Sequence, residues 1–283
     1  MRIRGIAVSI LAALSLGFGL LNIQPARAAP HAASANGALT PSQAEITKVI
    51  LGDTSIDGPA LWTTTSGVVR GALAWTGTDP AHHLNVMLTS IGTTFYSKVT
   101  LPETSPMRPA ITRTADGKVA IAWIGSDPGR TLNVLYDVYG ARVKLTLWGD
   151  NSPYSPALVA SNGALTLAWT GSNSAHSLNL LTIGVGNPLT RGAKTTLWSY
   201  GGLTGPSLSY EASRSEYTLA WAATSPSSQI AVARSTDARV WSAPALVSDW
   251  SESTPSLLGI VGNYYNMPPH YLAFTSANAT RGL

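Results

Sequence analysis

Thr166-Leu167-Ala168-Trp169-Thr170-Gly171 is the stretch of sequence that decides the fold, because close variants of it occur five times in the chain. The copies place one large aromatic residue every 46 to 53 residues, at Trp75, Trp123, Trp169, Trp221 and Phe274. A repeat of this length, built from short apolar runs and turns, is typical of β-propeller blades. The rest of the chain after residue 28 has no convincing helical periodicity.

The third copy predicts four strands, over residues 155–159, 164–169, 178–183 and 194–198. Asn162-Gly163 separates the first two and is typical of a tight hairpin turn. A proline precedes the first strand of every copy, at Pro59, Pro109, Pro156, Pro206 and Pro255. Four antiparallel strands make one blade, with the first strand innermost. We therefore predict an all-β, five-bladed β-propeller of four-stranded antiparallel blades over residues 45–283.

The two ends of this repeat array are irregular. Residues 45–51 match an outer strand but precede the first inner strand, so we expect them to close the ring, either paired with the strand at 271–274 or separated from it by a gap. Such closure removes exposed sheet edges. The fifth copy ends at Leu283, where its third strand would begin, so the last blade is expected to be incomplete.

The first 28 residues match a secretory signal peptide. Arg2 and Arg4 precede an apolar stretch, and Ala26-Arg27-Ala28 supplies a cleavage site. The apolar stretch is shorter than a typical membrane span. We expect a secreted, extracellular protein with no membrane anchor after cleavage, and a linker over residues 29–44.

Composition excludes several functions. The net charge of +4 falls to about +1 once the three arginines of the signal are removed, so a nucleic-acid partner is not expected. The chain has no cysteine, which excludes disulfides, thiolate metal sites and a cysteine nucleophile. No histidine pair has the spacing of a zinc site. We predict no cofactor and no metal.

Loops on one face of the propeller carry the candidate site residues. The crossovers between blades carry an acidic ring, Asp53, Glu103, Asp150 and Asp249, and the hairpins between second and third strands carry Asp79, Asp127 and Asn173. Basic or imidazole groups recur at the hairpin tips, at His82, Arg130 and His176. Asp and Asn bond their own backbone in tight turns; metal binding or acid–base chemistry is the alternative interpretation.

A second set of candidates follows the inner strands. Asp57, Arg108 and Ser155 stand at inner-strand starts and are expected at the mouth of the central channel. A concave mouth with a few convergent polar groups is a default ligand site. Trp148 and Trp198 occupy one repeat position and are either sugar-stacking platforms or packing residues. Asn85, Asn133 and Asn179 recur inside third strands and are interpreted as structural.

Ser235-Thr236-Asp237-Ala238-Arg239-Val240-Trp241 loosely matches an Asp-box turn, and with the Trp-Thr-Gly-x-Asp hairpins it resembles the sialidase-type propellers. That resemblance implies six blades, an arginine triad, a Tyr–Glu nucleophile pair and an Asp acid. Arg108-Pro109 resembles the setting of the first arginine, but the equivalent positions hold Ser155, Gly205 and Thr254. The five-blade count also resembles tachylectin-like lectins and arabinanase-type glycosidases.

Three functions follow from these observations. The first is a non-catalytic secreted module that binds glycans or another extracellular surface, with Arg108, Asp57, Ser155, Asp53, Asp249, Trp148 and Trp198 as ligand residues. The second is a sialidase-like glycoside hydrolase, which needs two carboxyl groups about 5–10 Å apart, for example Asp57 with Glu103 or Asp150. The third is a scaffold for protein partners.

Overall fold

The computed structural model describes residues 4–10, 47–64, 67–90, 94–224, 228–259 and 270–275. Within these ranges the chain forms strands and turns and no helix. Accordingly, no helix among the described residues is long and apolar enough to cross a membrane. The all-β class is confirmed.

Four consecutive sheets, which we call blades 1 to 4, each contain four antiparallel strands in chain order. Blade 1 consists of β3 (Ala60–Thr63), β4 (Gly71–Thr76), β5 (His83–Thr89) and β6 (Phe95–Thr104). Blade 2 consists of β7 (Ala110–Arg113), β8 (Val119–Ile124), β9 (Thr131–Tyr136) and β10 (Val143–Asn151). Blade 3 consists of β11 (Ala157–Ser161), β12 (Ala164–Thr170), β13 (Ser177–Gly184) and β14 (Thr190–Gly201). Blade 4 consists of β15 (Ser207–Glu211), β16 (Glu216–Ala222), β17 (Gln229–Ser235) and β18 (Ala245–Trp250).

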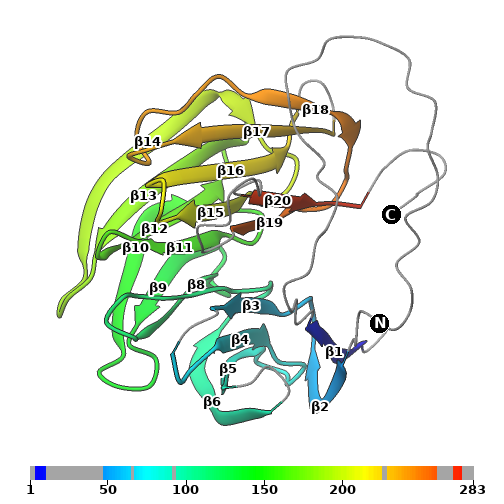
Figure 1. The fold of residues 1–283 in the computed structure, drawn as a ribbon, viewed down its shortest axis with the longest axis vertical. Coiled ribbons are helices and arrows are strands. Elements are labelled where there is room, and N and C mark those ends of the chain that lie inside the picture. Colours follow the sequence, from blue (N-terminus) through cyan, green and yellow to red (C-terminus); the bar gives the residue numbers. More distant parts are fainter. Residues whose placement is uncertain are drawn as a thin grey trace.

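The first strand of each blade is the innermost one (Figure 1). β3 contacts β7, β7 contacts β11 and β11 contacts β15, which in turn contacts the first strand of the next repeat, β19 (Ser256–Gly259). Each of these strands begins directly after the proline that the sequence marks. Proline lacks an N–H group and is therefore tolerated at the first position of a strand. The arrangement is that of a multi-bladed β-propeller, with four complete blades and β19 paired to β20 (His270–Ala273) in the described residues.

The tryptophans of the repeated phrase hold the blades together. Trp75, Trp123, Trp169 and Trp221 are each 1% exposed. Trp123 of blade 2 shares a core cluster with Leu84 and Val86 of blade 1, and Trp221 of blade 4 shares one with Leu178 of blade 3. Full burial of one large apolar side chain contributes about 1.5–3 kcal/mol. The predicted packing role of this ring is confirmed.

The tips of the hairpins between second and third strands have a backbone reason for their repeat. His82, Arg130, His176 and Ser228 all have positive φ, between 48° and 63°. This left-handed region is uncommon for residues other than glycine, and Asn, Asp and His enter it more easily than most. The shared feature of these positions is therefore the turn conformation.

The Asp-box-like segment forms the turn that its sequence suggests. Asp237 accepts hydrogen bonds from the backbone N–H groups of Arg239 and Val240, both at 2.8 Å, and from the Ser235 hydroxyl at 3.0 Å. Backbone bonds to a carboxylate favour its ionised form, and those from Val240 and Arg239 lower the pKa of Asp237. The likeness to an Asp-box thus extends to its hydrogen-bonded turn.

The N-terminal strand lies in a sheet separate from the last repeat. β2 (Thr47–Ser55) pairs antiparallel with β1 (Arg4–Ile10), while β20 pairs with β19. Among the described residues no ladder joins β2 to β20, which corresponds to the second expected arrangement, a gap between the two segments. The third strand of the fifth repeat falls in residues 276–283, outside the described residues. Most of residues 1–46 also lie outside, so the signal peptide and linker remain predictions.

Candidate functional site

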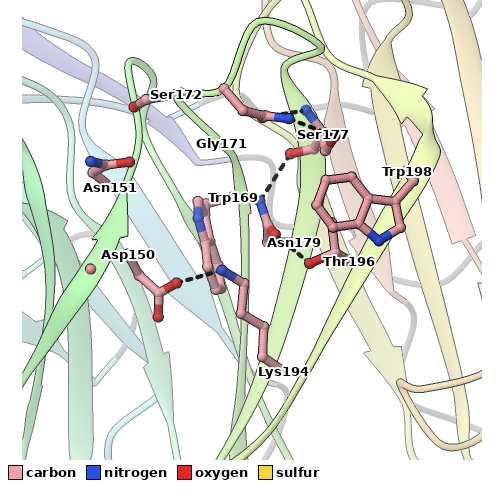
Figure 2. Close-up of a pocket in the computed structure, with 12 residues that line it drawn as sticks. Asp150, Asn151, Trp169, Gly171, Ser172, Ser177, Asn179, Lys194, Thr196 and Trp198 are labelled. Atoms are coloured by element: carbon pink, nitrogen blue, oxygen red, sulfur yellow. Dashed lines mark hydrogen bonds and ion pairs between the residues drawn. The ribbon is translucent and has the colours of Figure 1, made fainter.

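A pocket of about 410 Å³ opens between blades 2 and 3. Blade 2 contributes the end of β10, with Asp150 and Asn151. Blade 3 contributes the β12–β13 hairpin with Ser172, and strand β14 with Lys194 and Trp198. In the view of Figure 2, Asn151 and Ser172 lie on one side of the pocket and Trp198 on the other. This volume lies within the range of small-molecule sites.

The rim of this pocket carries groups that are available to a ligand. Trp198 is 74% exposed. The side chains of Asn151 and Ser172 make no hydrogen bond to other described residues, and Ser172 is exposed. An amide and a hydroxyl each both donate and accept hydrogen bonds. The pocket therefore combines a flat apolar surface with neutral polar groups opposite it.

Two cations from blade 3 hold Asp150 at the base of the pocket. Arg191 Nη2 donates to Asp150 Oδ2 at 2.7 Å, and Lys194 Nζ donates to Asp150 Oδ1 at 2.5 Å. The Asp150 side chain is 2% exposed. Lys194 Nζ also lies 5.1 Å from the ring centroid of Trp169, within the range of a cation–π interaction. Both oxygens of this predicted site residue are engaged in joining blade 2 to blade 3.

The same arrangement of acid, lysine and tryptophan recurs in blades 1 and 2. Lys144 of blade 2 donates to Glu103 at 2.6 Å and lies 5.4 Å from the ring of Trp123. In blade 1, Lys98 pairs with Asp53 and stacks over Trp75. Three members of the predicted acidic ring therefore form ion pairs with the blade that follows them. Asp249, the fourth member, lies half-buried on β18.

The recurring asparagines are structural, as the sequence predicts. Asn179 donates to the carbonyl oxygen of Ser177 at 3.0 Å and accepts from the Thr196 hydroxyl at 2.8 Å. Asn133 and Thr146 form the same bond at 2.9 Å, and Asn85 repeats it in blade 1. Each buried amide links the third strand of its blade to the fourth, so its polar groups are satisfied.

The hairpin acids also make turn contacts. Asp127 accepts from the backbone and the hydroxyl of Thr131, at 3.2 and 2.8 Å. Asp79 accepts from His83 Nδ1 at 2.7 Å and from backbone groups. Burial raises the pKa of Asp79, but the hydrogen bonds and charge of His83 outweigh it, so the pKa is lowered. The described residues contain no group of three His, Cys, Asp or Glu side chains placed to hold a metal ion.

Of the three candidates at the inner-strand starts, Asp57 and Arg108 are in contact, and Ser155 meets the next blade. Asp57 accepts from the backbone N–H of Arg108 at 3.3 Å and from that of Gly58 at 2.7 Å. A Cβ placed on Gly205 would lie 2.3 Å from the carbonyl oxygen of Ser155, so blades 3 and 4 meet there backbone to backbone. The contacts in this region are largely main-chain ones, and Asp57 is exposed.

A sequence pattern that repeats in three outer strands marks the position of the pocket. Outer strands contain Lys-x-Thr-Leu followed by Pro102, Trp148 or Trp198, over residues 98–102, 144–148 and 194–198. Residues at i, i+2 and i+4 of a strand lie on one face. The lysine of that face binds the acid of the preceding blade and the threonine binds the asparagine of its own blade. Trp198, at the last position of this face, lies at the edge of the pocket.

The site and fold together define a β-propeller with a polar, aromatic-edged crevice between blades. No protein-family model matches the chain, and no curated protein matches it in sequence. Among solved structures it is similar to AofleA from Arthrobotrys oligospora, with TM-score 0.57 and 14% identity over 76% of this chain and 65% of that one. It is also similar to 1,3Gal43A, an exo-β-1,3-galactanase from Clostridium thermocellum, with TM-score 0.52 and 12% identity. That match covers 79% of this chain and 56% of the galactanase chain.

A Trypanosoma rangeli sialidase aligns with TM-score 0.44 and 10% identity, over 78% of this chain and 44% of that one. The chain therefore spans about two thirds or less of the length of these solved proteins. The likeness to AofleA and to 1,3Gal43A, at 14% and 12% identity, shows a shared fold.

Proposed function

We propose that this protein is an exported glycan-binding module that holds a sugar in the pocket between blades 2 and 3. The observation that carries the proposal is the 74% exposed Trp198 at the edge of a pocket of about 410 Å³ that is lined with amides and hydroxyls. A sugar ring has an apolar C–H face and an edge of hydroxyl groups. The face would stack on Trp198 and the hydroxyls would bond Asn151 and Ser172.

Electrostatics and stability support binding at the rim. Asp150 and Lys194 at the base bind each other and keep the two walls in place. Trp198 projects from this rigid support, and a platform that needs no reordering loses little entropy when a ligand binds. The fold shared with a named galactanase is consistent with a glycan ligand, although the proposal rests on the pocket.

A glycan array and a pull-down with cell-wall polysaccharides test the proposal on the exported protein. Trp198→Ala should weaken binding tenfold or more, about 1.4 kcal/mol, with little change in melting temperature because the side chain is exposed. Trp250→Ala is the matched control, since Trp250 is 38% exposed and lies outside the pocket lining. Silence in both assays would refute the proposal. Turnover of aryl-glycosides would favour a hydrolase, and capture of one specific protein would favour a scaffold.

A further inference from the structure

The boundary between blades 1 and 2 repeats the side-chain contacts that line the pocket between blades 2 and 3. Lys144 bonds Glu103 as Lys194 bonds Asp150, at 2.6 and 2.5 Å. Thr146 bonds Asn133 as Thr196 bonds Asn179, at 2.9 and 2.8 Å. The backbone geometry also repeats, because Ser105 and Ser152 each bond the carbonyl oxygen two residues ahead.

This boundary also has an exposed aromatic side chain. Trp148 is 78% exposed, against 74% for Trp198. It follows Lys144, which reaches Glu103 of blade 1, and Thr146, which bonds Asn133 within blade 2. Trp148 therefore stands at the repeat position that Trp198 occupies at the edge of the pocket between blades 2 and 3.

The boundary between β2 and blade 1 has the same contacts but no tryptophan at its edge. Lys98 pairs with Asp53 and stacks over Trp75, and Thr100 bonds Asn85. Pro102 stands at the position of Trp148 and Trp198. The repeat therefore distinguishes two boundaries with an exposed tryptophan from one without it.

We propose that the boundary between blades 1 and 2 is a second glycan site, built on Trp148, Asp127 and Glu103; the inference rests on the proposed function. Its sugar preference differs because its charges differ. Asp127 stands in the hairpin position of Asn173, and Glu103 faces one cation where Asp150 faces two. Arg130 on the same hairpin directs its guanidinium at the carbonyl oxygen of Pro153. Compared with the first site, the second has one more carboxylate, Asp127, and one fewer cation on Glu103, so it takes neutral or cationic sugars in preference to anionic ones.

Three trisaccharides of similar size but different charge test this proposal. N-acetylchitotriose is neutral, chitotriose with free amino groups is cationic, and trigalacturonate is anionic. Native mass spectrometry and calorimetry would count bound molecules on the exported protein, its Trp148→Ala and Trp198→Ala variants, and the double variant. We expect two bound molecules of N-acetylchitotriose on the wild type, one on each single variant and none on the double variant. Trigalacturonate should bind once, and that binding should be lost in Trp198→Ala.

Asp127→Asn gives the second site the uncharged residue that the first site has at this position. The turn should be kept, because Asn173 accepts the equivalent hydrogen bond from the N–H of Ser177 at 3.0 Å. The variant should raise the affinity of the second site for trigalacturonate at least threefold and leave the first site unchanged. One bound N-acetylchitotriose on the wild type, unaffected by Trp148→Ala and lost in Trp198→Ala, would overturn the second site and leave the proposed function intact. If none of the three trisaccharides binds, both the second site and the proposed function are contradicted.

Discussion

Replacing Asp150 with Asn should destabilise the protein far more than replacing Glu103 with Gln. The Asp150 side chain is 2% exposed and binds two cations, whereas the side chain of Glu103 is 23% exposed and binds one. A hydrogen bond to a charged group contributes about 1.5–3 kcal/mol. Arg191 and Lys194 are 42% and 34% exposed and regain water when their partner is lost. We therefore expect Asp150→Asn to lower the free energy of unfolding by about 2–3 kcal/mol. Glu103→Gln, in a more exposed pair, should lower it by about 0.5–1 kcal/mol.

Urea unfolding followed by tryptophan fluorescence measures both differences in the free energy of unfolding. The double variant Asp150→Asn/Lys194→Met should cost less than the sum of its parts, because the two residues act as one pair. Equal small losses for Asp150→Asn and Glu103→Gln would refute the account of Asp150 as a buried join between blades. Loss of glycoside hydrolysis with unchanged stability would instead favour the catalytic role.

Three further predictions concern other parts of the chain. Gly205→Ala should lower the melting temperature, because a Cβ there would lie 2.3 Å from a backbone oxygen of blade 3; Gly58→Ala, where nothing lies within 4 Å, is the control and should change little. Asp237→Ala should destabilise the protein at pH 7. The pKa of Asp237 is lowered below its ordinary 3.8 in the folded state, so its contribution is present above that value and is lost as the pH falls through the lowered pKa; equal destabilisation at pH 7 and pH 3 would contradict this. Exported protein should begin at Ala29, and an intact N-terminus in mass spectrometry would exclude cleavage after Ala28.

Sequence patterns predicted the elements that repeat within one blade. The prolines before the inner strands and the buried tryptophans mark the blades, since both depend on local chain geometry and on burial. The ion pairs were harder to predict, because Lys144 and Glu103 are 41 residues apart and meet only when two blades stack. How the two ends of the ring meet was equally hard to predict, because β2 and β20 lie in separate sheets with no ladder between them in the described residues. The pocket could not be predicted from the sequence without knowing which strand face meets the neighbouring blade.

One strand face performs two tasks in these blades. On β14, Lys194 and Thr196 are bound to Asp150 and Asn179, whereas Trp198, further along the same face, is exposed. A chain with no cysteine must join its blades by packing and charge; Lys194 does so, and Thr196 fixes β14 to β13 within the blade. The side chain at the rim position makes no such contact with other described residues. Blade 1 has Pro102 there and still keeps the hydrogen bond between Thr100 and Asn85. Substitution at the rim can therefore change or remove a ligand site while the ring stays intact. The main-chain contacts at the inner-strand starts offer no comparable freedom, which is why the crevices between blades, rather than the channel mouth, are the better place to look for the ligand.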